Sequence, residues 1–590
     1  MWHAGEAMIS LDHYLELAGR QFDPEVHMIG RPWRSPGYHT ALEDGRFVHL
    51  TRETVYYALA LLERDSSTDR ATAEGAVDAV LALQDTDPVR ASFGSWPWTA
   101  EEPIDAMPLV DMNWADFIGV GLSLLLLKHR GKVSGGLASR VESALFYALQ
   151  ADFRRNMRPS YTNIAVMGAS LCLVGGRALE NEFFRQYGRR RLERFAEYTD
   201  EQRGFNEYNS PTYSVVAALE LERILRFSDD DAASAVAERI LTNIWRMIVA
   251  HLHPQTGEWG GPHARAYTER LMPSARFWLA ERLPRDLGDA FRGEEVSDLR
   301  DGSILDRAPV FHDPVPCPES VVSELRGRIA SDGAGTTDRH VHIRFADSPP
   351  MEATVYRDNR LIFGTMSEEC FWTQRHGIIG YLASEESEVG VLRVRGTKDG
   401  NDFASLGFRA TQWGRVALVG AVSFSNLGDW HLMLDRPGDS TFSGRSLALE
   451  VQAPAQWRAL PDGRFAAEFD GARIVLVPGP AESAHTVRTW QASGNTLSLP
   501  LYHSGGRSLR LTSLVPMVAV FGLAVVSNRS NDTDGVAGEH EPRGLDSSPT
   551  VDDWETGATP TPTAVEAQWA ALPGKRLQLP TSPVSYRFPG

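Results

Sequence analysis

Apolar residues recur every three to four positions through the first half of the chain, which is the spacing of amphipathic and buried helices. The connections between these segments are short and polar, so we expect consecutive helices to pair as antiparallel hairpins. The predicted helical segments are 51–64, 71–84, 115–129, 138–153, 163–174, 182–198, 212–227 and 232–252.

After about residue 300 the pattern changes to short runs in which apolar and polar residues alternate, bounded by Gly, Asp and Pro. Such runs predict many antiparallel strands. We therefore predict an α+β multidomain protein, with helical hairpins over 1–300, a proline-rich linker over 301–337 and an antiparallel β-sandwich over 338–590. Residues 527–565 are polar and rich in turn formers, which predicts a long surface loop, with a lid as the alternative.

Polar loops interrupt the apolar helices at intervals of about 50 residues, around Asn113, Asn163, Tyr213 and His263. One helical hairpin with its two connections has about this length. Hairpins repeated in order close into a ring or stack into a solenoid, and either arrangement returns every second connection to the same end. We expect the side chains of these loops to converge on one rim and to line a common site.

Helix capping is the simpler interpretation, because Ser, Thr and Asn are common N-cap residues and Pro is common in the first turn. Capping accounts for about one residue in each loop. It leaves unexplained a set of phenols, charged groups and an imidazole in the same loops: Tyr161, Glu207, Tyr208, Tyr213, His263, Arg265 and Tyr267.

Aromatic side chains in these loops point to a carbohydrate ligand, because flat rings stack on the apolar faces of sugars while amides and carboxylates bind hydroxyls. The alternative is that the tryptophans fill the hydrophobic ends of the helical assembly. The candidate substrate-binding residues are Trp96, Trp98, Asn113, Trp114, Asp116, Tyr161, Asn209 and Trp259.

Composition removes several other classes of function. The formal charge is −18, and the basic run "GRRRLERF" is typical of a solvated helix face, so we do not expect nucleic-acid binding. The three cysteines have no paired spacing, which argues against a disulfide framework or a zinc site, and we predict no cofactor. The chain shows neither a secretory leader nor an apolar run long enough for a membrane span, so we expect a cytoplasmic protein.

The order of helical hairpins and β-sandwich resembles the heparinase II/III-like and alginate-lyase-like polysaccharide lyases, whose helices form an (α/α) toroid. Those enzymes carry an Asn in one toroid loop, a Tyr about 50 residues later and a His in the β-domain. Asn163 with Tyr213 or Tyr208 has this order, and His376 in "FWTQRHGIIGY" is the β-domain candidate, ahead of His431. The His that the family often has near the Asn is missing from "YTNIAV", and His263 is the available substitute.

The resemblance implies β-elimination at a uronic acid in an anionic poly- or oligosaccharide. Asn163 with Arg265 or His263 would hold the carboxylate. Tyr213 or Tyr208 would act as acid, base or both, and His376 or His263 as the partner base. The reactive groups would thus come from loops of both domains.

Two alternatives remain open at this point. An inverting glycoside hydrolase would use Glu207 as acid and Asp111, Asp116 or Glu102 as the second carboxylate, roughly 6.5–9.5 Å away. A non-catalytic glycan-binding protein would need only the aromatic residues. The sequence names no sugar, and a homodimer through the large β-face also stays open.

Overall fold

The computed structural model describes most of the chain, and all structural statements below refer to the residues it describes. These residues are 10–34, 40–293, 313–342, 351–369, 374–403, 406–423, 441–442, 446–483, 486–487, 489–503, 509–510, 518–527, 554–555, 564–569 and 576–580. His431 and nearly all of the predicted loop over 527–565 lie outside them.

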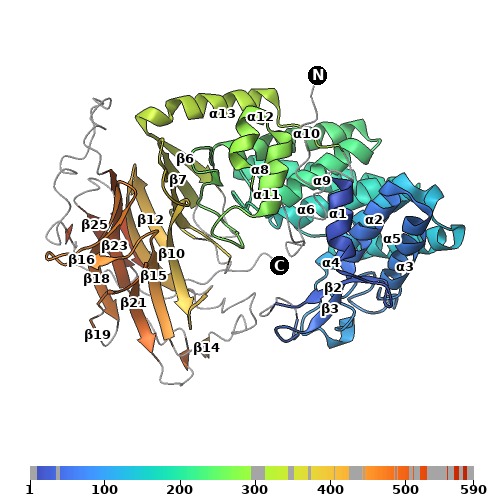
Figure 1. Ribbon diagram of the computed structural model, residues 1–590, viewed down its shortest axis with the longest axis horizontal. Helices are drawn as coiled ribbons and strands as arrows, with labels where there is room; N and C mark the ends of the chain where they lie inside the picture. Colours follow the sequence, from blue (N-terminus) through green and yellow to red (C-terminus); the bar gives the residue numbers. More distant parts are fainter. Residues whose placement is uncertain are drawn as a thin grey trace.

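Helices dominate the part of the chain before residue 335 (Figure 1). Each predicted helical segment contains a helix, and α2 has the predicted bounds. The helices are α1 (Leu11–Gly19), α2 (Thr51–Arg64), α3 (Ser67–Leu81), α4 (Asn113–His129), α5 (Gly135–Arg155), α6 (Thr162–Ser170), α7 (Gly176–Ala178), α8 (Glu182–Gln202), α9 (Tyr213–Phe227), α10 (Asp231–Val249), α11 (Pro273–Arg282), α12 (Arg285–Gly288) and α13 (Glu319–Ser331).

Two hydrophobic clusters hold the helices together. The first joins α1 to α5, with Leu61, Leu125 and Leu145 among its buried members. The second joins α6 and α8 to α11. Val321 and Leu325 of α13 also belong to the second cluster. The predicted linker over 301–337 therefore contains a helix that packs with the helical half.

Antiparallel sheets make up the rest of the chain, together with short sheets in the helical half. The larger of the two main sheets has the order β20-β21-β15-β10-β9-β8-β7-β6, with β11 on β10. The other has the order β12-β13-β23-β18-β17-β16, with β19 on β18. The small sheets are β1-β2-β3, β4-β5, β14-β22 and β24-β25-β26.

Strands of two to twelve residues form these sheets. They are β1 (Phe22–Asp23), β2 (Met28–Pro32), β3 (Phe47–Leu50), β4 (Leu252–His253), β5 (Glu258–Trp259), β6 (Thr336–His342), β7 (Met351–Arg357), β8 (Leu361–Met366), β9 (Ile378–Leu382), β10 (Gly390–Lys398), β11 (Asn401–Asp402), β12 (Leu406–Trp413), β13 (Val416–Ser423), β14 (Thr441–Phe442), β15 (Ser446–Gln452), β16 (Arg458–Ala459), β17 (Phe465–Phe469), β18 (Ala472–Ser483), β19 (Thr486–Val487), β20 (Gln491–Ser493), β21 (Thr496–His503), β22 (Leu509–Arg510), β23 (Val518–Ser527), β24 (Trp554–Glu555), β25 (Ala564–Trp569) and β26 (Arg576–Pro580).

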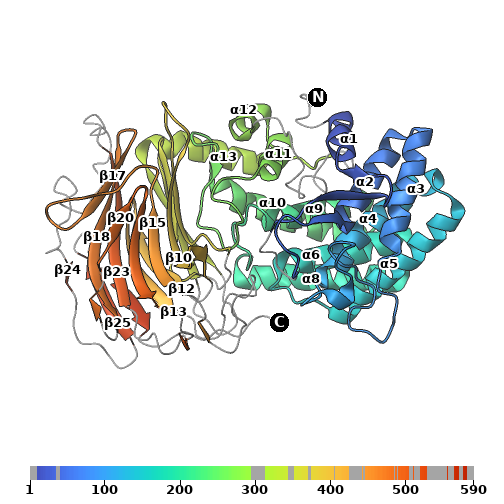
Figure 2. The ribbon, with the colours of Figure 1, turned by 60° about the horizontal axis from the view of Figure 1, so that its bottom comes forward.

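The two main sheets share one hydrophobic core, which contains Leu392 and Leu449 from the larger sheet and Leu476 and Phe521 from the other. Figure 2 shows the two sheets side by side at one end of the molecule and the helices at the other. The α+β content and its order along the chain agree with the sequence prediction, whereas the closure of the helices into a toroid stays a prediction.

The outer face of the larger sheet meets the helical half closely. Ile362 and Ile379 lie on this face. A Cβ atom at Gly261 would lie 2.1 Å from Cγ2 of Ile379, and one at Gly260 would lie 2.3 Å from Cδ1 of Ile362. A side chain at either glycine would require these isoleucines to shift, so the segment after β5 is held directly against the sheet.

Candidate functional site

A short antiparallel pairing between the two halves builds the candidate site. The backbone N–H of His263 donates to the carbonyl of His376, and the reverse bond is also present, both at 2.9 Å. Ala266 N–H donates to the carbonyl of Gln374 at 2.6 Å. The imidazole rings of His263 and His376 have their centroids 6.2 Å apart. The pairing also brings the side chain of Gln374 against that of Arg265.

Arg265 is the centre of a polar network at this pairing, and it is 2% exposed. Its Nε donates to Oε1 of Gln374 at 3.0 Å, and its Nη1 donates to Oε1 of Glu207 at 2.7 Å. Its Nη2 donates to the hydroxyl of Tyr213 at 3.0 Å. The guanidinium carbon also lies 4.0 Å from the ring centroid of Tyr213, so this cation contacts both the face and the hydroxyl of the phenol.

Glu207 and Asn163 form the buried end of the network. Asn163 lies in the first turn of α6, where backbone N–H groups have no partner within the helix. Glu207 supplies that partner, because its Oε2 accepts from the Asn163 N–H at 2.8 Å. The Asn163 side-chain amide also donates to both carboxylate oxygens, at 2.8 and 2.6 Å. Glu207 thus caps α6 and holds Arg265 at the same time.

Tyr213 and Tyr267 form the exposed end. Their hydroxyl groups are hydrogen-bonded to each other, and Tyr267 is 42% exposed. A continuous chain of hydrogen bonds therefore runs from Tyr267 through Tyr213, Arg265 and Glu207 to Asn163, which is fully buried.

Burial and nearby charges set the protonation states at this site. Burial raises the pKa of Tyr213 well above its usual value, and Arg265 offsets part of this effect. Burial also raises the pKa of Tyr161. Burial lowers the pKa of His263 to about 4. Burial, with the positive charge of Arg393, lowers the pKa of His376 well below its usual value. At pH 7 Tyr213 and Tyr161 are therefore protonated, and the imidazoles of His263 and His376 are neutral.

The buried histidines predict an acid-sensitive fold. Burial lowers the pKa values of His253 and His263 to about 4, below the unfolded value near 6.5. Between these values the unfolded chain binds more protons, so the free energy of unfolding falls as pH drops from about 6.5 towards 4, by about 3 kcal/mol per histidine over the full window. Urea unfolding at a series of pH values measures this change.

His253→Gln should reduce this pH dependence, because the variant lacks the imidazole that is neutral in the folded protein and takes up a proton on unfolding below pH 6.5. The Nε2 of His253 donates to the carbonyl of Asp358 at 2.7 Å and crosses from one half to the other. An identical pH dependence in wild type and variant would contradict the prediction.

Two predicted site residues have partners in the protein interior instead. The hydroxyl of Tyr208 is 3.1 Å from Nε2 of His251, and Tyr208 is 4% exposed. The amide of Asn209 donates to the carbonyls of Gly260 and Pro262, both at 2.9 Å, and its oxygen accepts from the Trp259 indole at 2.5 Å. These contacts shape the loop that carries Glu207.

The predicted tryptophans fall into two groups. Trp96 and Trp259 are 0% and 1% exposed and belong to the hydrophobic clusters of the helical half, so they fill its interior. Trp98 and Trp114 are partly exposed, with ring centroids 5.1 Å apart. Only the second pair is placed where a ligand can reach it.

Asn113 and Asp116 also differ in their surroundings. The side-chain amide of Asn113 lies 3.4 Å from the hydroxyl of Tyr161, which places it next to the candidate site. Asp116 is 1% exposed and lies 3.7 Å from Nη1 of Arg155. Burial raises the pKa of Asp116 well above its usual value, and Asp152 adds to this effect. Asp116 is therefore part of the helical interior.

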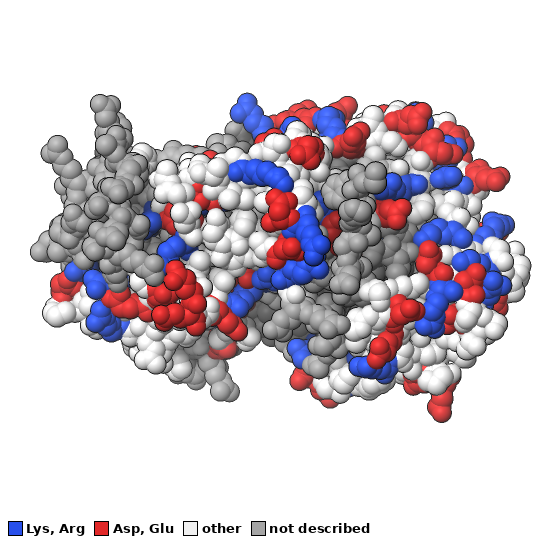
Figure 3. Space-filling view, turned by 45° about the horizontal axis from the view of Figure 1, so that its top comes forward, with Lys and Arg blue, Asp and Glu red and all other residues white. Residues whose placement is uncertain are grey.

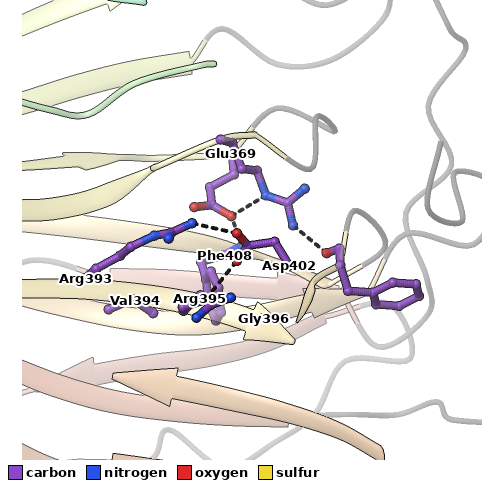
Figure 4. Close-up of a pocket in the computed structure, with 9 residues that line it drawn as sticks. Glu369, Arg393, Val394, Arg395, Gly396, Asp402 and Phe408 are labelled. Carbon is purple, nitrogen blue, oxygen red and sulfur yellow. Dashed lines mark hydrogen bonds and ion pairs between the residues drawn. The ribbon is translucent and has the colours of Figure 1, made fainter. Parts of the chain in front are cut away.

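The sequence analysis missed Gln374, which lies two residues before His376 and meets Arg265 only because the two halves of the chain pack together. It also missed the small polar pocket beside the site, which is shown in Figure 4. There Arg393 donates to Asp402 and to Glu269, both at 3.0 Å, and Arg395 donates to Asp402 at 2.9 Å. Glu269 belongs to the segment that carries Tyr267, so this network fixes that segment to β10.

On the face shown in Figure 3, lysine and arginine side chains are interspersed with aspartate and glutamate over the helical half. Within the described part of the chain, every helix is too short or too polar to cross a membrane.

Comparisons with known proteins give the following similarities. A family model described as "Domain of unknown function (DUF8769)" matches residues 20–275. Among curated proteins, no sequence matches. The solved structures that are similar include heparinase III, at 8% identity and a TM-score of 0.42, over 90% of this chain and 82% of that one.

A chondroitin AC lyase of Streptomyces coelicolor A3, solved in complex with chondroitin sulphate, is similar at 9% identity and a TM-score of 0.33, over 89% of this chain and 97% of that one. The endoglucanase CelQ from Clostridium thermocellum, complexed with cellotetraose, is similar at 10% identity and a TM-score of 0.20, over 82% and 84%. At these values the similarities assign no activity to this chain.

Proposed function

We propose that the chain is a carbohydrate-active enzyme that cleaves uronic-acid-containing poly- or oligosaccharides by β-elimination, on a helical toroid joined to a β-sandwich. The observation that carries the proposal is the contact of Arg265 with both the ring and the hydroxyl of Tyr213, at the exposed end of a buried polar network. A phenol held by a cation in this way is suited to proton transfer.

The protonation states favour Tyr213 as the acid. Its phenol is protonated at pH 7, because burial raises its pKa, and Arg265 stabilises the phenolate that forms when the proton leaves. The neutral imidazole of His376 is the partner base, and its Nδ1 has no hydrogen-bond partner among the described residues. In the proposed step His376 takes the C5 proton, the C4–O4 bond breaks as the C4–C5 double bond forms, and Tyr213 protonates O4.

The remaining candidates take supporting roles in this proposal. Asn163 is fully buried and its amide is bound to Glu207, so it orients Glu207 instead of touching the sugar. Nδ1 of His263 lies 2.6 Å from the carbonyl of Asn209, which fixes the imidazole beside His376. Tyr267 links Tyr213 to solvent, and Tyr161 with Asn113 lines the approach to the site.

Hydrolysis is the second candidate, and the contacts of its carboxylates disfavour it. Glu207 accepts hydrogen bonds from Asn163 and Arg265, so its charge serves to anchor a cation. Asp111 accepts from Asn113 N–H and from the Trp98 indole, and Glu102 accepts from the N–H of Ala41. An inverting hydrolase needs one carboxyl group that donates its proton and another that activates a water.

The experiment that tests the proposal is an ultraviolet absorbance scan over a panel of uronate-containing polysaccharides and oligosaccharides, with reducing-end release followed in parallel. Elimination creates an unsaturated uronate that absorbs in the ultraviolet, so absorbance and reducing ends should rise together. Reducing ends without absorbance would establish hydrolysis. No change in either absorbance or reducing ends would favour a protein that binds glycans without cleaving them.

A further inference from the structure

Three indole rings lie in a row beside the candidate site. The ring centroid of Trp98 is 6.0 Å from that of Trp33 and 5.1 Å from that of Trp114, with the planes tilted by 46° and 34°. All three residues are partly exposed. Trp33 lies directly after β2 and carried no functional expectation from the sequence. Adjacent, partly exposed rings form a surface on which the apolar faces of sugar rings stack.

Hydrogen bonds fix this row to the candidate site. Asp111 accepts from the Trp98 indole at 3.1 Å and from the backbone N–H of Asn113 at 3.0 Å. Asn113 in turn donates to the hydroxyl of Tyr161, and the Trp114 indole donates to Oγ1 of Thr51 at 2.9 Å. Asp111 and Asn113 therefore connect the row to Tyr161.

A cation lies against the same row. The guanidinium carbon of Arg52 is 5.4 Å from the Trp114 ring centroid and 5.3 Å from that of Phe117. Its Nη2 donates to Oε1 of Glu53 at 3.1 Å, and its side chain is 15% exposed. A sugar ring stacked beside Trp114 would therefore lie next to the guanidinium of the Arg52–Glu53 pair, and a guanidinium binds carboxylate and sulfate oxygens through its fixed fork of N–H donors.

We propose that Trp33, Trp98, Trp114 and Arg52 form a binding subsite for a sugar ring that carries a carboxylate or sulfate group, beyond the ring at the reacting bond. The proposal rests on the proposed function, since it extends that site along the same chain of sugars. It implies that an oligosaccharide long enough to contact both Tyr213 and Trp33 binds more tightly than a shorter one.

Binding measured without turnover tests whether the three indole rings bind a sugar. In a Tyr213→Phe background, oligogalacturonides and alginate oligosaccharides of two to six sugars are titrated by calorimetry. Trp33→Leu should weaken binding of the six-sugar chain about tenfold and leave the two-sugar chain nearly unchanged. Trp33→Phe keeps an aromatic ring, so its affinity for the six-sugar chain should lie between those of the parent and of the leucine variant. It replaces the leucine variant if that protein does not fold.

Trp413→Leu is the matched control, because Trp413 is 43% exposed on β12, in the other half of the molecule. Its binding constants should match those of the parent. Equal losses in the Trp33 and Trp413 variants, equal losses for short and long chains, or no loss at Trp33 would overturn the row as a subsite.

Arg52→Gln tests the chemistry of the ligand. The variant should weaken binding of uronate oligosaccharides several-fold and leave neutral cello-oligosaccharides of the same length unchanged, whereas equal effects on both would overturn the acidic assignment. Sulfated and unsulfated chondroitin oligosaccharides then distinguish sulfate from carboxylate. Because binding is measured without cleavage, tight binding with no elimination in the parent enzyme refutes the proposed function and leaves the subsite standing.

Discussion

Tyr213→Phe is expected to lower the rate of elimination by about 10²- to 10⁴-fold, the usual range for removing a general acid–base group, while the protein stays folded. The phenylalanine ring keeps the contact with the Arg265 guanidinium, and only the hydroxyl is lost. The change should therefore appear in kcat more than in KM, since Tyr213 gives its proton to O4 during the reaction and contributes little to substrate binding. Steady-state absorbance assays on the best substrate of the panel measure both constants.

Tyr208→Phe is the control for this prediction, because Tyr208 has the same residue type in the same loop. Its hydroxyl is 3.1 Å from His251 in the interior, and burial raises its pKa. Its loss should destabilise the fold by about 1 kcal/mol and leave kcat nearly unchanged. If Tyr208→Phe removes activity and Tyr213→Phe keeps it, the acid has been assigned to the wrong tyrosine.

The helices were predictable because their apolar residues repeat over several turns. Residues 51–64 show this spacing throughout and form α2 with those bounds. The spacing is uninformative where helical geometry changes, as in the turn Leu171–Gly175, where a π-helical segment follows α6. The helix α13 was missed because its surroundings are rich in proline, and its packing partners lie far away in the sequence.

The polar loops were predictable as a set, and the structure brings Asn163, Glu207, Tyr213 and Arg265 into one network. The sequence did not separate Tyr213 from Tyr208. The first begins α9 and meets Arg265, whereas the second turns towards His251. Nor did it reveal the pairing of His263 with His376, because that contact depends on how the two halves of the chain pack.

Glu207→Gln is expected to destabilise the protein by about 3–5 kcal/mol, because it leaves the buried charge of Arg265 without its carboxylate. Arg265 and Glu207 are each 2% exposed, so water does not replace the lost partner. Elimination should fall at least about tenfold, since Arg265 then no longer holds Tyr213 in place. Urea unfolding and steady-state kinetics on the same preparation measure the two effects.

The hydrolytic alternative predicts a different outcome for the same variant. If Glu207 were the acid of a hydrolase, the glutamine variant would lose turnover and the limb of the pH–rate profile that reports this acid. Under the elimination proposal the residual activity keeps the shape of its pH profile, because Tyr213 and His376 still carry the protons. Loss of one limb would contradict an anchoring role for Glu207.

A double variant separates stability from chemistry at this pair. Glu207→Met combined with Arg265→Met removes both buried charges and leaves only neutral groups of Asn163 and Gln374 without partners, which costs less than a buried charge without its counter-ion. The double variant should therefore be more stable than Glu207→Gln alone. Elimination should be no faster than in Glu207→Gln, because the cation beside the Tyr213 hydroxyl is gone. Recovery of activity together with stability would mean that Arg265 serves the fold and not the reaction.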